Sequence, residues 1–142
     1  MQEPPEHFHE TVRQRFAEVA VKPDREKKFP VGPESAKSLG YDSDEIDGLP
    51  TSVTASFCGV GNPLALGALH AGQTVLDLGS GAGLDSILAA RRVGPGGRVI
   101  GVDMTPEMVS KSRGNVHTLG LDNVEFRQGT LETLPVADAD VD

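Results

Sequence analysis

The sequence has 142 residues, of which 37% are hydrophobic and 24% charged, a balance typical of one globular domain rather than of a disordered chain. Its formal net charge of -8 disfavours nucleic acid and anionic membranes as partners, because an acidic surface repels phosphate groups. No apolar run reaches the roughly 20 residues of a membrane span, no signal-peptide core is seen, and the single cysteine fits a reducing cytoplasm.

The first part of the chain, residues 1–70, lacks strong strand signals and is expected to form a helical cap region. Apolar residues recur at helical spacing near its start and predict one amphipathic helix, with the apolar positions Phe8, Val12, Phe16, Val19 and Ala20. Prolines then interrupt the chain, so only short helices are expected in the rest of this region.

Three such short helices are predicted before residue 70. The first spans residues 34–39, and the second spans residues 44–47 with Ser43 as its cap. Asn62 and the proline after it are typical of an N-cap and a first helical position, which predicts a third helix over residues 64–69.

From residue 74 onward, strands and helices alternate, which predicts a parallel sheet covered by helices. The expected elements are a strand over 75–78, a helix over 84–92, a strand over 98–102, a helix over 106–119 and a strand over 124–127. We therefore expect residues 71–142 to form the first half of an α/β domain.

A glycine-rich motif directly follows the first predicted strand and reads Asp77-Leu78-Gly79-Ser80-Gly81-Ala82-Gly83. Glycines at alternate positions leave room for a ligand to approach the backbone at the carboxyl end of a parallel strand. The helix that follows offers free N–H groups to an anionic group. Asp77 is placed to hold an ammonium group, either directly or through water.

A nicotinamide dinucleotide site is the main alternative for this motif. Such a site needs the pattern G-x-G-x-x-G/A. Counting from Gly79 places Leu84 at the last position, and counting from Gly81 places Ser86 there. The last glycine is therefore missing in both registers, whereas the tighter G-x-G-x-G pattern after an acidic residue resembles the first motif of class I S-adenosylmethionine-dependent methyltransferases.

Two further signals occur in the order that this resemblance requires. Asp103 ends the second strand, where Rossmann-like sites place a carboxylate on the ribose hydroxyls, although it also suits a helix-capping acid. The resemblance implies that Met104 packs on the adenine and that Thr130 and Leu131 contact the adenine edge. It implies a Rossmann-like fold with S-adenosylmethionine as cofactor.

The resemblance is closest to the arsenite methyltransferase family and covers roughly residues 30–142. It rests on the segments Gly61-Asn62-Pro63-Leu64-Ala65-Leu66, Thr74 to Gly83, Val99 to Met108 and Leu134-Pro135-Val136-Ala137-Asp138. Members of that family transfer methyl groups to trivalent arsenic held by cysteine thiolates. One such cysteine precedes Gly-Asn-Pro, but Val60 stands at that position here.

Cys58 lies two residues before Val60 and is the only thiol in the chain. It is a candidate substrate-side residue, although a lone cysteine is more often a small buried hydrophobe. Because arsenic needs several soft ligands, the resemblance carries over the fold and the cofactor but not the arsenic substrate. No metal site is expected, since His7 and His9 would point to different helix faces and His70 and His117 have no acidic partner at a telling spacing.

The sequence therefore predicts a cytoplasmic S-adenosylmethionine-dependent methyltransferase acting on a small-molecule acceptor. The alternatives are arsenite methylation proper, a non-catalytic cofactor-binding fragment and a nicotinamide-binding module. The resemblance places a fourth strand where the chain ends, so the 142-residue chain is expected to be inactive and prone to associate through an exposed edge of the first strand. Oligomeric state and catalytic residues are not indicated by the sequence.

Overall fold

The computed structural model describes residues 5–25 and 30–142. Its first half is helical, as the sequence predicts, with the elements α1 (Pro5–Val21), η1 (Pro23–Arg25), α2 (Pro33–Ser38), α3 (Ser43–Asp47), α4 (Thr51–Thr54) and η2 (Pro63–Ala65). The amphipathic helix over Phe8 to Ala20 is confirmed as α1, whose buried residues Val19 and Ala20 face α6.

Three details of this helical half differ from expectation. Asp42 rather than Ser43 caps α3, because its side chain accepts the Glu45 backbone N–H at 2.9 Å. The helix predicted over residues 64–69 is only the single 3-10 turn η2, and the side chain of Asn62 makes no capping bond there. Helix α4 was not predicted, since its threonine-rich sequence has a low intrinsic helix propensity.

The second half has the elements β1 (Thr74–Leu78), α5 (Leu84–Val93), β2 (Arg98–Asp103), α6 (Pro106–Leu119) and β3 (Val124–Gln128). The strands are parallel in the order β1-β2-β3, with Val75 opposite Val99 and Val99 opposite Val124. These are the predicted strands and helices, with bounds that differ by at most one residue at either end. Gly120 ends α6 in the left-handed conformation, which a glycine adopts without strain.

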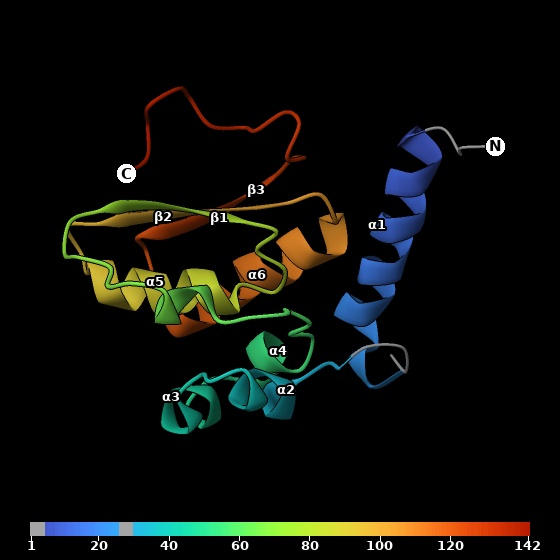
Figure 1. The fold of residues 1–142 in the computed structure, drawn as a ribbon, viewed down its shortest axis with the longest axis horizontal. Coiled ribbons are helices and arrows are strands. Elements are labelled where there is room, and N and C mark those ends of the chain that lie inside the picture. The colour runs from blue at the N-terminus through green and yellow to red at the C-terminus, as the bar shows by residue number, and fades with distance from the viewer. Residues whose placement is uncertain (1–4, 26–29) are drawn as a thin grey trace.

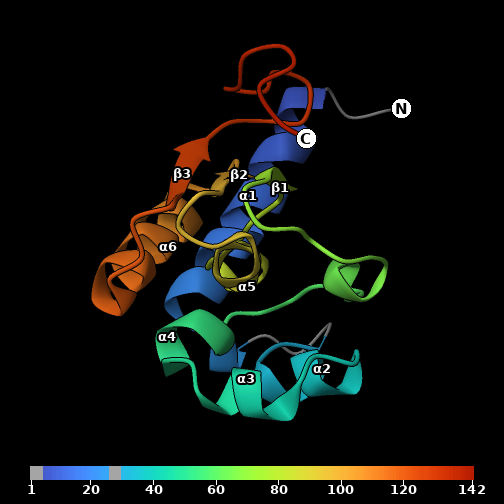
Figure 2. The ribbon, with the colours of Figure 1, turned by 90° about the vertical axis from the view of Figure 1, so that its left-hand side faces the viewer.

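Helices α5 and α6 cover one face of the sheet, and the segment after β3 runs over the other side (Figure 1). An apolar core cluster joins the two halves of the chain, because Ile46 and Val53 of the helical half belong to the same cluster as Ile87 and Val99 of the sheet layer. Figure 2 shows α2, α3 and α4 beneath α5, on the side of that helix away from the sheet.

Strand β1 pairs with β2 only, among the described residues, so the predicted order with β1 at the edge is confirmed. At Thr74, the first residue of β1, the edge that faces away from β2 is covered by Asp142. The Asp142 N–H donates to the Thr74 carbonyl at 2.9 Å, and the Asp142 carboxylate accepts the Thr74 N–H at 2.7 Å. Self-association through the rest of this edge stays a prediction.

None of the helices in residues 5–25 and 30–142 combines the length and apolar character of a membrane span.

Candidate cofactor site

A cavity of about 520 Å³ opens at the carboxyl ends of the three strands. This volume lies within the range of roughly 300–1,000 Å³ that small-molecule and cofactor pockets occupy. Its floor is the turn after β1 and the ends of β2 and β3, and α1 contributes Phe8, Val12 and Phe16 to one wall. The segment after α4 supplies Phe57 and Cys58. Carboxyl ends of parallel strands are where ligands bind in open α/β sheets.

Most of the residues that the sequence singles out line this cavity. They are Cys58, Gly79, Ser80, Gly81, Asp103, Met104, Thr130 and Leu131. Two others do not line it: Asp77 lies beneath the glycine loop, and Gly83 ends the loop where it packs on β3. Leu131 is 67% exposed and stands at the rim. The structure thus brings the three sequence motifs together around one space.

The glycine loop is built by three residues in the left-handed region, where φ is 71° at Gly79, 55° at Gly81 and 100° at Gly83. A Cβ added at Gly79 or Gly81 would meet nothing within 4 Å, so both face open space. At Gly83 it would lie 2.9 Å from the Phe126 ring. The first two glycines therefore leave room for a ligand, whereas the third lets the loop pack on β3.

Asp77 is largely enclosed beneath this loop. Its Oδ2 accepts a hydrogen bond from the Ser86 hydroxyl at 2.6 Å. The pKa of Asp77 is raised to about 6, chiefly by burial; the Ser86 hydrogen bond acts to lower it, and the nearby Asp85 and Asp103 carboxylates act to raise it. A carboxyl group with this pKa is ionised at neutral pH but is poorly compensated, which favours a cation nearby.

Asp103 ties the end of β2 to the glycine loop. Its Oδ2 accepts the Gly81 backbone N–H at 2.9 Å and its Oδ1 accepts the Thr105 N–H, also at 2.9 Å. The second bond closes an Asx-type turn that leads into α6, whose N-cap residue Thr105 makes no side-chain capping bond. Asp103 also lines the cavity, so each oxygen keeps a lone pair for a ligand hydroxyl.

Two site features were not predicted from the sequence. Asp85, in the first turn of α5, lines the cavity and accepts a hydrogen bond from the Tyr41 hydroxyl. Across the mouth, the His9 Nε2 of α1 lies 3.4 Å from a carboxylate oxygen of Glu132 after β3. Asp85 lies two residues after the last glycine of the motif, and this position could have indicated a role at the site. No spacing in the sequence could link it to Tyr41, which lies 44 residues earlier.

The polar groups of the otherwise largely apolar lining suit a cationic ligand. The hydroxyls of Ser80 and Thr105 are buried at the cavity without a hydrogen-bond partner. The charged side chains along the described lining are the carboxylates Asp85, Asp103 and Glu132, with no lysine or arginine. Cys58 is the only thiol there, and the described residues contain no group of three or more potential metal ligands.

Comparison with known proteins agrees with this geometry. Residues 69–142, more than half of the chain, match the family model described as "Methyltransferase domain". An arsenite methyltransferase of Halobacterium salinarum is 54% identical over 106 residues, which cover 75% of this chain and 27% of that protein. An arsenite methyltransferase of Aquipseudomonas alcaligenes is 42% identical over 86 residues, which cover 58% of this chain and 24% of that protein. The chain thus spans about a quarter of the length of these relatives.

The fold has a counterpart among solved structures. A SAM-dependent methyltransferase from Aquifex aeolicus superposes with a TM-score of 0.54 at 32% identity, covering 80% of this chain and 55% of that one. The three-stranded parallel sheet with α5 and α6 is the part of the fold that carries the glycine motif. From the sequence motifs, the cavity they surround and these matches, it follows that the chain belongs to the family of S-adenosylmethionine-dependent methyltransferase domains.

Proposed function

We propose that this chain binds S-adenosylmethionine in the cavity at the strand ends and that the protein transfers its methyl group to a small-molecule acceptor. One observation carries the assignment. Asp103 and the open Gly79–Gly81 loop are joined by a hydrogen bond at the wall of a cavity whose described lining includes three carboxylates and no lysine or arginine. An activated methyl group on a sulfonium cation is what the cofactor supplies when bound.

The residues take the following roles in this proposal. The Asp103 carboxylate binds the ribose hydroxyls, while Met104 and the Thr130–Leu131 segment border the adenine. Gly79, Ser80 and Gly81 lie along the amino-acid portion, and Asp77 acts on the cationic end from beneath the loop. Gly83 shapes the loop because it packs on Phe126, and it does not itself contact the cofactor. The helical region 1–70 would form a cap over residues 71–142, with α1 as one wall.

The nicotinamide alternative is less well supported. Its dinucleotide carries a negatively charged diphosphate, which would face Asp85 and Asp103 with no described lysine or arginine at the cavity. Leu84 also stands where the dinucleotide pattern needs its last glycine, and its side chain is 4% exposed in the core.

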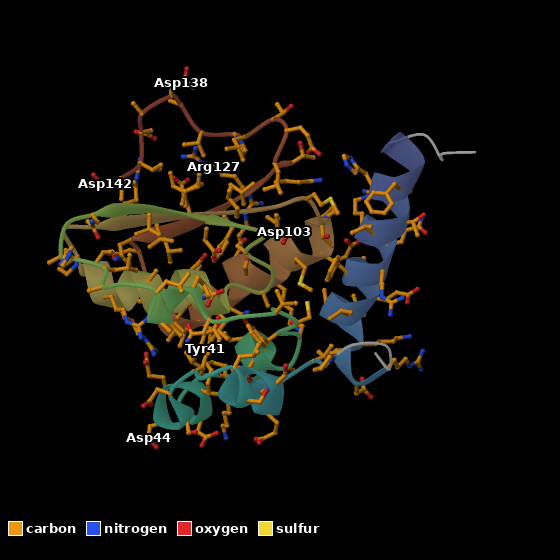
Figure 3. The ribbon with its side chains drawn as sticks, viewed as in Figure 1. Tyr41, Asp44, Asp103, Arg127, Asp138 and Asp142 are labelled. Carbon is orange, nitrogen blue, oxygen red and sulfur yellow. The ribbon has the colours of Figure 1, made fainter. Side chains whose placement is uncertain are left out.

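The first prediction tests the cofactor assignment through Asp103. Asp103→Ala should weaken binding of S-adenosylhomocysteine by about 1–3 kcal/mol, the value of hydrogen bonds to a charged group. Calorimetric titration with S-adenosylhomocysteine and with NAD measures this directly. Asp138→Ala is the matched control, because that carboxylate is exposed and stands apart from Asp103 on the segment after β3 (Figure 3). Unchanged affinity in a folded Asp103→Ala variant, or tight binding of NAD alone, would contradict the assignment.

Arsenite is a second candidate acceptor, favoured by the relative that is 54% identical. Against it, Val60 is 98% exposed and offers no thiol, and Cys58 is the one thiol of the chain. The proposal is therefore limited to a small-molecule acceptor of a class other than trivalent arsenic. We propose a cytoplasmic location, because a chain with a single cysteine fits a reducing compartment. The net charge of -8 disfavours nucleic acid as a partner.

The second prediction is that Cys58 alone does not support arsenite methylation. Trivalent arsenic binds through several soft ligands, and one thiol at this cavity is too few. The protein should give no methylated arsenic above background when supplied with S-adenosylmethionine, arsenite and a thiol reductant. Product formation that is lost in Cys58→Ser, but kept in the matched Ser56→Ala variant, would show the opposite and would assign the thiol a substrate role.

A further inference from the structure

A carboxylate at the cavity has no role in the function proposed above. Asp85 is the second residue of α5, lines the cavity and is half-buried. Burial raises the pKa of its carboxyl group. Arg92, the cation whose charge acts on it, makes its ion pair with Glu45 instead, at 3.2 Å. In the described part of the chain, Asp85 therefore faces the cavity without an ion-pair partner.

Tyr41 holds this carboxylate in place. Its ring is 5% exposed and packs edge-to-face on Phe57 with 5.3 Å between the ring centroids. Its hydroxyl donates a hydrogen bond to Asp85 Oδ1. Figure 3 shows Tyr41 between the short helices and α5, so the helical half of the chain orients a group of the sheet layer. A buried aromatic donor restricts the rotamers that Asp85 can adopt.

A second observation places unpaired polar groups at the same cavity. The hydroxyls of Ser80 and Thr105 are without partners, and their side chains are 9% and 0% exposed. A buried hydroxyl without a partner is unfavourable, so a ligand that pairs with it is bound more tightly. Because both residues line the cavity beside which Asp85 stands, these groups are suited to a ligand with polar atoms and a positive charge.

The position of Asp85 indicates which part of the ligand it meets. With the ribose on Asp103 at the end of β2 and the adenine near Thr130 after β3, the amino-acid portion must extend toward the turn between β1 and α5. Asp85 stands at that turn. We propose that Asp85 binds the ammonium group of the amino-acid portion of S-adenosylmethionine, and that Tyr41 is its positioning residue; this rests on the function proposed above.

Two ligands separate this role from a general effect on the site. S-adenosylhomocysteine carries the amino-acid portion, whereas 5′-methylthioadenosine keeps the adenosine and thioether but has no ammonium group. Asp85→Asn should lower the affinity for S-adenosylhomocysteine about tenfold to a hundredfold, as expected for the loss of a charged hydrogen bond. Affinity for 5′-methylthioadenosine should change less than about twofold. Asp103→Asn is the matched comparison and should weaken both ligands, because both contain the ribose.

Each result of the titration bears on the assignment. Equal loss for both ligands, or no loss for either, would overturn the role of Asp85. Tighter binding of S-adenosylhomocysteine would overturn it too, because the carboxylate would then face the carboxylate of the ligand. If the wild-type protein bound neither ligand, the proposed function itself would fail. The melting temperature shows whether Asp85→Asn is folded, and removal of a half-buried unpaired charge should not lower it.

Tyr41 is tested through its dependence on Asp85. Tyr41→Phe removes only the hydroxyl and should weaken S-adenosylhomocysteine by a smaller factor, again without effect on 5′-methylthioadenosine. In the Asp85→Asn background, Tyr41→Phe should have no further effect, because the group that it positions is gone. An additive loss in the double variant, or a loss shared by both ligands, would show that the hydroxyl acts on the fold and not through Asp85.

Discussion

Replacing Gly101 by alanine should destabilise the protein by about 1–3 kcal/mol or more, because the middle of β2 has no room for a side chain. Gly101 lies opposite both Asp77 and Phe126 in the sheet. An added Cβ would lie 2.5 Å from the Phe126 ring and 3.0 Å from the Ser80 Cβ. The displaced groups belong to the core and to the glycine loop, so affinity for S-adenosylhomocysteine should fall with stability.

Gly114→Ala is the matched control for this substitution. Gly114 lies inside α6, is exposed, and an added Cβ would meet nothing within 4 Å. This variant should gain roughly 0.5–1 kcal/mol, since glycine is a poor helix former. Urea denaturation of both variants measures the difference. Phe126→Leu should restore part of the stability of Gly101→Ala, and a Gly101→Ala variant as stable as wild type would show that the ring moves aside freely.

Asp77 should make the folded protein less stable as the pH rises. Its pKa is about 6 when folded and takes the ordinary value of 3.8 when the chain unfolds, so the folded state binds the proton more tightly. The free energy of unfolding should fall between about pH 4 and pH 6 and level off above that. The difference corresponds to on the order of 2–3 kcal/mol.

Asp77→Asn removes this titration and keeps an acceptor for the Ser86 hydroxyl. The variant should be more stable than wild type at pH 8 and close to it at pH 4, while its affinity for S-adenosylmethionine should be lower. Urea denaturation across this pH range measures the first effect and calorimetry the second. A stability difference that does not change with pH would mean that the carboxyl group of Asp77 is not perturbed by burial.

The parts of the fold that the sequence predicted correctly are those with strong local signals. Strand β1 is followed at once by three glycines with positive φ, and α6 begins at a proline and ends at Gly120, so each boundary is encoded in adjacent residues. Helix α4 has no such signal, because Val53 is held by burial in the shared core rather than by helix propensity.

The same distinction applies to the cavity. The floor of the cavity comes from sequence motifs within residues 77–131. The structure brings most of these motifs together there, as expected for the carboxyl ends of parallel strands. The contact between Tyr41 and Asp85 depends on how the helical half packs against α5, which no local pattern encodes. The failed cap at Ser43 has a simpler cause, since Asp42 offers an equally good acceptor one residue earlier.

The contact between Tyr41 and Asp85 has a spectroscopic consequence. Tyr41 is the only tyrosine of the chain, and there is no tryptophan, so near-ultraviolet fluorescence of the whole protein arises from one phenol ring. A carboxylate that accepts the phenol hydrogen bond quenches tyrosine emission. A ligand that weakens the hydrogen bond between Tyr41 and Asp85 should therefore brighten the emission, so the native protein carries an optical reporter of Asp85, a residue that lines the cofactor cavity.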